Sequence, residues 1–153
     1  MKVFFKPTFI RQFKALDEGF QEEVIEKINE LKAHYKQVIL NYTYMHNETG
    51  VIWELSKAQK VKERTGCHVS VDCAQIIGTV KDFQRLNVSL DAYSFSGHKF
   101  GALKGIGFSF VKKSFHITPL ILGGGQQGKL RSGTLNTHGI VSLEYALRDQ
   151  TFE

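Results

Sequence analysis

The sequence predicts an α/β fold whose sheet is mostly parallel. Apolar residues are nearly continuous from Val38 to Tyr44, and such a run is typical of a strand that is buried on both faces, as in a parallel sheet. A helical stretch and a turn-rich link separate this run from further strand-like stretches, so strands and connections alternate along the chain. All glycines except Gly19 lie beyond residue 49, which indicates a helical N-terminal arm joined to a loop-rich α/β body.

The N-terminal arm, residues 1–34, is predicted to hold a short strand at Lys2 to Phe5 and two helices. Thr8 could cap the first helix, and the second runs from Phe20 to His34. Each helix has one apolar stripe, as expected when one side packs on a core. The residues of these stripes are Phe9, Ile10, Phe13 and Leu16 in the first helix, and Phe20, Val24, Ile25, Ile28 and Leu31 in the second.

Residues 35–153 are predicted to form the α/β body. Short β-prone runs bounded by turn residues indicate its strands, and apolar residues at helical spacing indicate its helices. The strands are expected at residues 37–45, 67–71, 91–95 and 106–111, and the helices at residues 55–65 and 137–147. Gly66 directly follows the first of these helices, and we expect it to be the C-cap.

The composition fits one ordinary globular domain, with 153 residues, 42% of them hydrophobic and 23% charged. No apolar run reaches the roughly twenty residues that span a bilayer, and no signal peptide precedes the first strand, so no membrane association is expected. Cys67 and Cys73 do not suggest a disulfide framework, which makes the cytoplasm the expected compartment. The net charge of +5 fits nucleic acid, a phosphate-bearing cofactor and an anionic substrate equally well.

Polar residues follow three of the predicted strands. Asn47, Asp72 and Lys99 come at or just beyond strand ends, and functional groups of parallel sheets gather beyond those ends. A lysine at the end of a buried strand is costly as an ammonium, so its pKa tends to fall, and a neutral lysine is what imine chemistry with a carbonyl requires. Ser96 and His98 could donate to an anion beside it.

Simpler interpretations of these residues remain open. A lysine near serine in a loop is more often a solvated surface residue than a catalytic one. Asp72 either pairs with the protonated ring nitrogen of a cofactor or caps the following turn. Further along, the Gly123–Gly128 segment would let backbone approach a ligand, or would only form a flexible loop. Arg131 is shaped for bidentate binding of a carboxylate or phosphate, or forms a surface salt bridge.

Six short motifs between Val38 and Leu147 together resemble the middle of the large domain of a cysteine desulfurase, a family within the class V aminotransferases. The motifs are HNETG (46–50), VDCAQ (71–75), SFSGHK (94–99), KGIGF (104–108), GGGQ (123–126) and RSGT (131–134). They occur in the order and at the spacing of that family. The resemblance implies a partial large domain of a pyridoxal-phosphate-dependent transferase, with a mostly parallel sheet.

The resemblance also implies which residues contact the ring of pyridoxal phosphate. Lys99 would bind the cofactor covalently and act in catalysis. Asp72 would pair with the pyridine nitrogen and keep it protonated. Gln75 and Asn47 would contact the phenolic oxygen, and Asn47 could also touch the substrate.

Four further positions match residues that bind the phosphate group or the substrate in the family. Ser96 and His98 would hold the cofactor phosphate. Thr134 would reach the phosphate that the other subunit of a homodimer binds, and Arg131 would bind the substrate carboxylate.

The implied activity is the transfer of sulfur from L-cysteine to an acceptor, leaving L-alanine, as in iron–sulfur cluster assembly. The acceptor could be a separate sulfur-acceptor protein. The family's nucleophilic cysteine is expected on a loop beyond Glu153, and neither Cys67 nor Cys73 lies where it belongs, so both are expected to be packing residues. A phosphate-binding segment and a ring-stacking histidine have no counterpart before Val38. We therefore expect a truncated chain with impaired or no activity alone.

Two other functions remain open. The chain could be a non-catalytic remnant or interaction module, because a doubly wound sheet cut on both sides exposes edges and apolar faces. Residues 1–32 also resemble the start of RelE/ParE-family toxins, in which a strand precedes a helical hairpin with a basic and aromatic pattern like FKPTFIRQFKAL. That resemblance would imply action on nucleic acid. Since the functional residues of those toxins find no counterpart here, nucleic acid is not the expected partner.

Overall fold

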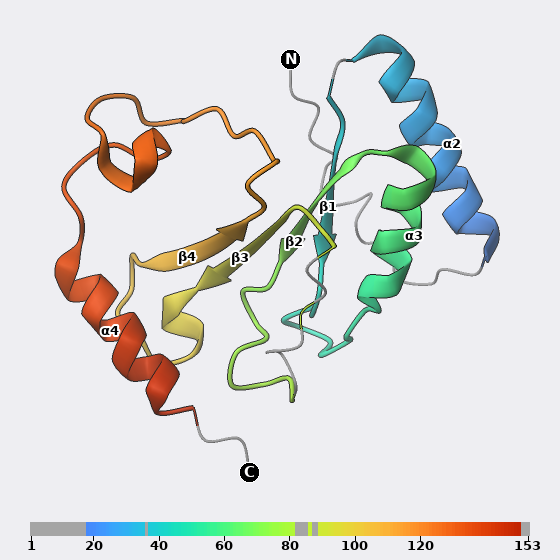
Figure 1. The fold of residues 1–153 in the computed structure, drawn as a ribbon. Coiled ribbons are helices and arrows are strands. Elements are labelled where there is room, and N and C mark those ends of the chain that lie inside the picture. Colours follow the sequence, from blue (N-terminus) through green and yellow to red (C-terminus); the bar gives the residue numbers. More distant parts are fainter. Residues whose placement is uncertain (1–17, 36, 82–85, 87–88, 151–153) are drawn as a thin grey trace.

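A computed structural model describes residues 18–35, 37–81, 86 and 89–150 (Figure 1). The strand expected at residues 2–5 and the first expected helix lie outside these residues. The remaining expected elements are present, with ends within two residues of the expected ones. In chain order they are α2 (Glu18–His34), β1 (Ile39–Thr43), α3 (Leu55–Thr65), β2 (His68–Asp72), β3 (Ala92–Ser96), the 3₁₀ turn η3 (Gly97–Lys99), β4 (Gly107–Val111), the 3₁₀ turn η4 (Gln126–Lys129) and α4 (Thr137–Arg148).

The four strands form a single sheet in the order β1-β2-β3-β4. β1, β2 and β3 are parallel, whereas β4 is antiparallel to β3. α3 supplies the crossover that a parallel β1–β2 pair needs, while the antiparallel β3–β4 pair is joined by a short connection that contains η3. The predicted α/β fold with a mostly parallel sheet is therefore confirmed.

The sheet has one apolar face and one polar face. The apolar face continues from strand to strand because the register pairs apolar residues, for example Leu40 with Val69 and Val71 with Tyr93. The polar face carries Asn41, Thr43, Ser70, Asp72, Ser94 and Ser96, which alternate with the apolar positions along β1, β2 and β3. This alternation differs from the expectation of a first strand buried on both faces, because Ile39, Asn41 and Thr43 of β1 are only half-buried.

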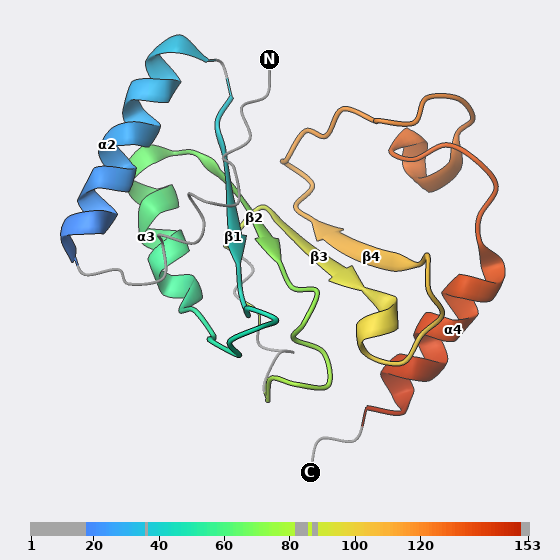
Figure 2. The same ribbon diagram turned by 180° about the vertical axis from the view of Figure 1, so that it is seen from behind.

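α2 and α3 lie side by side next to β1 and β2, while α4 lies beside β4 at the other end of the sheet (Figures 1 and 2). Val24 and Ile28 of α2 and Val61 of α3 are almost completely buried in the same core as the sheet. α3 ends at Gly66, whose φ of 64° is left-handed and whose N–H donates to the carbonyl of Lys62 at 2.7 Å, as predicted for a C-cap. The domain boundary expected at residue 34 remains a prediction.

A buried carboxylate, Asp91, joins α3, β2 and β3 at the start of β3. It forms an ion pair with Lys62 at 2.6 Å and accepts a hydrogen bond from the N–H of Val69 at 2.9 Å. His68 lies further away, at 3.7 Å. Burial alone raises the pKa of Asp91, but the hydrogen bonds from Lys62 and Val69 outweigh it, so the pKa lies below its usual value. This cluster connects α3, β2 and β3 at the end of the sheet opposite the carboxyl ends of the parallel strands.

Candidate functional site at the carboxyl edge of the sheet

The candidate site lies where the parallel strands end. Asp72 is the last residue of β2, and Ser96 is the last residue of β3. The register places Asp72 opposite Thr43 of β1 and opposite Ser94 of β3. These side chains line one pocket of about 430 Å³ on the polar face of the sheet. The structure therefore brings Asp72 and Ser96 together.

The Asp72 carboxylate is exposed and accepts a hydrogen bond from the N–H of Ala74 at 2.9 Å. It thus caps the turn after β2, which is one of its two expected roles. Because the carboxylate is exposed, a cofactor nitrogen can still reach it, so the second role is compatible with the first. The same turn carries Gln75, which is half-buried, and is anchored by the buried side chains of Ile76 and Ile77.

Lys99 lies directly beyond β3, as the last residue of η3. Its side chain and that of His98 are exposed, so the described residues do not supply the desolvation that we expected for a lysine at the end of a buried strand. The turn itself is well fixed: the N–H groups of Phe100 and Ala102 both donate to the carbonyl of Gly97 at 3.1 Å. The lysine is therefore exposed on a rigid base, at the same sheet edge as Asp72.

α4 forms the support beneath this turn. A Cβ on Gly97 would lie 2.8 Å from Leu143 of α4 and 2.9 Å from the carbonyl of Ile106, so only glycine fits there. The N–H of Leu103 donates to the hydroxyl of Ser142 in α4 at 3.2 Å. Sequence reasoning identified the helix but missed this role. The only sign of it was a glycine at the centre of the lysine motif.

Asn47 lies in the turn that follows β1 and is exposed. The strand end is tied to β2, because the N–H of Tyr44 donates to the carbonyl of Asp72 at 2.9 Å. The turn is closed by a hydrogen bond from the N–H of His46 to the carbonyl of Val51 at 3.0 Å. The hydroxyl of Thr49 lies 3.1 Å from His46 Nδ1. Asn47 thus projects from an ordered turn at the same edge as Asp72.

Arg131 and Thr134 lie elsewhere in the chain's fold. η4 and the short turn that carries Lys99 lie on opposite sides of β4 in both views (Figures 1 and 2). The guanidinium of Arg131 donates to the carbonyl of Ser132 at 2.9 Å, and the Ser132 hydroxyl donates to the carbonyl of Gly124 at 2.8 Å. One chain therefore does not bring Arg131 or Thr134 to Lys99, and their expected roles remain predictions.

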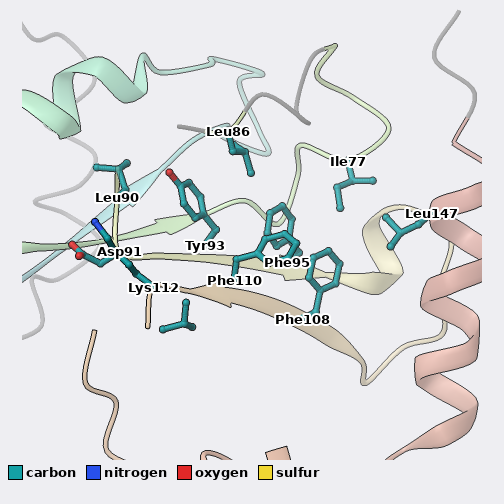
Figure 3. A pocket seen from close by; sticks show the side chains of 11 residues that line it. Ile77, Leu86, Leu90, Asp91, Tyr93, Phe95, Phe108, Phe110, Lys112 and Leu147 are labelled. Atoms are coloured by element: carbon teal, nitrogen blue, oxygen red, sulfur yellow. The ribbon is translucent and has the colours of Figure 1, made fainter. Parts of the chain in front are cut away.

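A second, larger cavity of about 640 Å³ opens on the apolar face (Figure 3). Phe95 stacks on Phe108 with ring centroids 4.6 Å apart, and Phe110 packs edge-on against both. The charged residues of its lining are Asp91, which is already paired with Lys62, and Lys112. None of the predicted site residues lines it, and Phe110 in its lining is 61% exposed, so it is an apolar surface cavity separate from the candidate site.

Both cysteines are unpaired and buried. Burial raises the pKa of the Cys73 thiol to about 12, and the neighbouring Asp72 carboxylate adds to the effect. Burial also raises the pKa of Cys67. The prediction that both are packing residues is confirmed, because neither is accessible or ionised at neutral pH.

A family model described as aminotransferase class-V matches residues 9–149. Two curated relatives are cysteine desulfurases named IscS. The one from Methanosarcina thermophila is 34% identical over 117 residues, which are 76% of this chain and 28% of the relative. The one from Ehrlichia chaffeensis is 36% identical over 117 residues, which are 74% of this chain and 28% of the relative. The chain thus spans less than a third of the length of these relatives.

Solved structures show the same similarity. A NifS-like protein from Rickettsia africae is 28% identical, with a TM-score of 0.67 over 82% of this chain and 35% of that one. A cysteine desulfurase from Thermococcus onnurineus, solved in its apo state, is 25% identical, with a TM-score of 0.68 over 90% of this chain and 36% of that one. Among the described helices, none is long and apolar enough to cross a membrane.

Proposed function

Because the chain belongs to the class-V aminotransferase family, we propose that it is part of a cysteine desulfurase-like protein, which moves sulfur from L-cysteine to an acceptor and leaves L-alanine. The names of the relatives support this choice of substrate within the family. The observation that carries the proposal is the meeting of Asp72, Ser96 and the Lys99 turn at one sheet edge.

The family is pyridoxal-phosphate-dependent, and the chemistry of the residues at this edge fits that cofactor. Asp72 offers an exposed carboxylate, Lys99 an exposed amine and Ser96 a hydroxyl beside the 430 Å³ pocket. An acid for the pyridinium nitrogen and a lysine for the aldehyde are the groups such sites require. When bound, pyridoxal phosphate supplies an electron sink for negative charge that develops on the substrate.

The residues of this chain would then have the following roles toward the cofactor. Asp72 accepts a hydrogen bond from the protonated ring nitrogen and keeps it charged, while Ala74 holds the carboxylate in place from the other side. Lys99 holds the cofactor through Nζ, and the rigid η3 turn fixes where that atom lies. Ser96 and His98 donate to the phosphate. Asn47 would reach the ring oxygen from the turn after β1.

The thiol that receives sulfur is neither of the chain's two cysteines, because both are buried. We infer that a separate cysteine supplies it, with a sulfur-acceptor protein as the later recipient. The unpaired cysteines also support action in a reducing compartment, for which the cytoplasm is our choice.

We also propose that the chain forms a homodimer. Leu120 and Leu122 are 97% and 80% exposed, at the start of the segment that carries η4, Arg131 and Thr134. Exposed leucines in one segment are typical of a surface that another protein covers. Thr134 lies away from Lys99 within one chain. It would therefore be Thr134 of a second copy that reaches the cofactor phosphate at this site.

The test is a visible absorption titration of the full chain with pyridoxal phosphate. We expect a band that depends on Lys99, with borohydride reduction fixing the cofactor to that residue in a peptide map. Lys99→Ala should abolish the band. Lys104→Ala is the matched control, because it removes an exposed lysine five residues away and should change nothing. A band that survives in Lys99→Ala, or none in the unaltered chain, would leave the chain a non-catalytic remnant.

A further inference from the structure

Gln150 lies just beyond the end of α4 and connects it to two turns of the candidate site. Its Nε2 donates to the carbonyl of Phe100, the residue after Lys99, at 3.0 Å, and to the carbonyl of Ala146 in α4 at 3.1 Å. The same side chain lies against Gly78, since a Cβ added to Gly78 would be 2.4 Å from Gln150 Oε1. One amide group thus contacts both the lysine turn and a second turn.

The second turn is the one that follows Asp72 and carries Gln75. Gly78 within it has a φ of +77°, which favours glycine, and the absence of a side chain is what allows Gln150 to come so close. α4 and this second turn also approach each other on the apolar side, where Leu147 of α4 and Ile77 of the turn line the cavity together (Figure 3). The amide of Gln150 therefore lies where α4 and the turn that carries Gly78 already approach each other.

We propose that Gln150 is a positioning residue, which holds the turn carrying Lys99 at a fixed distance from the turn that follows Asp72. The proposal rests on the proposed function above, because one cofactor must meet both residues for that distance to matter. A displacement of about 1 Å at such a site can lower a rate by about a hundredfold. Gln150 acts through the backbone of Phe100 and through Gly78, and it touches neither cofactor nor substrate.

The first experiment compares the unaltered chain with Gln150→Leu, whose side chain is one bond shorter, stays apolar and cannot form hydrogen bonds. We expect the amides of Phe100 and Ala102 to exchange with deuterium about fivefold faster, and cofactor affinity to fall about fivefold, the effect of losing one hydrogen bond. At saturating cofactor, the fraction of Lys99 trapped by borohydride should also fall. A general loss of stability would leave that fraction unchanged in the folded protein. Asp149→Asn, an exposed neighbour, is the matched control.

A second experiment tests the contact itself. Gly78→Ala strains the backbone in any chain, but the added Cβ meets Oε1 only where Gln150 is present. Gly78→Ala should therefore lower the urea midpoint more in the unaltered chain than in a Gln150→Ala chain. Equal shifts in the two backgrounds would show that the side chains do not meet and would overturn the proposal.

Each remaining outcome of the Gln150→Leu experiment also decides whether the proposal stands. Unchanged amide exchange in Gln150→Leu overturns the proposal, whatever the cofactor does. Faster exchange with unchanged affinity and unchanged trapping at Lys99 shows a structural contact only, which also overturns it while the proposed function stands. If the unaltered chain binds no cofactor, the proposed function fails, and the positioning role fails with it.

Discussion

The ion pair between Lys62 and Asp91 offers the sharpest test of the fold. The Asp91 side chain is 6% exposed and that of Lys62 is 22% exposed, so the carboxylate is the more deeply buried partner. Lys62→Met keeps the aliphatic stem and removes the charge. Asp91 then keeps the N–H of Val69 and the more distant His68, but loses Lys62, the one cation that lies within 3 Å of it among the described residues.

The expected magnitude follows from that burial. Breaking a buried ion pair costs about 3–5 kcal/mol because the remaining charge is left uncompensated. Lys62 is partly solvated, so we expect the lower end, a loss of about 3 kcal/mol in the free energy of unfolding at pH 7. Urea denaturation followed by circular dichroism measures it. Lys60→Met, an exposed lysine of the same helix, should stay within about 0.5 kcal/mol of the unaltered chain.

The pH dependence provides an independent check. The pKa of Asp91 is lower in the folded chain than in the unfolded one, so its contribution is fully present above the unfolded value, near 3.8, and is lost as pH falls through the folded value. The difference between the unaltered chain and Lys62→Met should therefore shrink below about pH 4. A Lys62→Met chain as stable as the unaltered one at pH 7 would refute this account.

Two further outcomes follow from the packing. Gly107→Ala should destabilise the chain by about 1–3 kcal/mol, because a Cβ there would lie 2.4 Å from the carbonyl of Phe95, whereas Gly125→Ala meets nothing within 4 Å and should be neutral in thermal melting. Cys67 and Cys73 should resist iodoacetamide at pH 8 in the folded chain and react once urea unfolds it, since burial raises the pKa of both thiols. Rapid labelling of the folded chain would contradict their burial.

Much of the fold could be predicted because its signals are local. Helix α3 ends at Gly66 as expected, since a left-handed C-cap depends on one residue. The position of Asp72 at a strand end could also be predicted, because parallel strands end at one edge of the sheet. The exposure of Lys99 agrees with the simpler interpretation, a solvated lysine in a loop, and not with the desolvated lysine expected at the end of a buried strand. A strand whose sequence indicates burial can still end in an exposed turn. Only the packing around that turn decides whether the lysine side chain is exposed.

Contacts between distant segments could not be predicted. The support that α4 gives to Gly97 depends on how a helix forty residues later folds back. The alternation of β1 was also missed, although Asn41 and Thr43, two residues apart in the strand, were a local sign of it. The place of Arg131 cannot be derived from spacing along the chain, because it depends on the course of the connection between β4 and α4.

The reversed direction of β4 has a genetic consequence. It carries the chain away from the edge where Lys99 lies, so in the proposed dimer each site would combine Lys99 from one copy with Thr134 from the other. A mixed dimer of Lys99→Ala and Thr134→Val copies would then hold one site with both defects and one with neither. Two variants that each fail to bind cofactor alone should therefore complement each other when mixed and refolded together, regaining about a quarter of the normal sites.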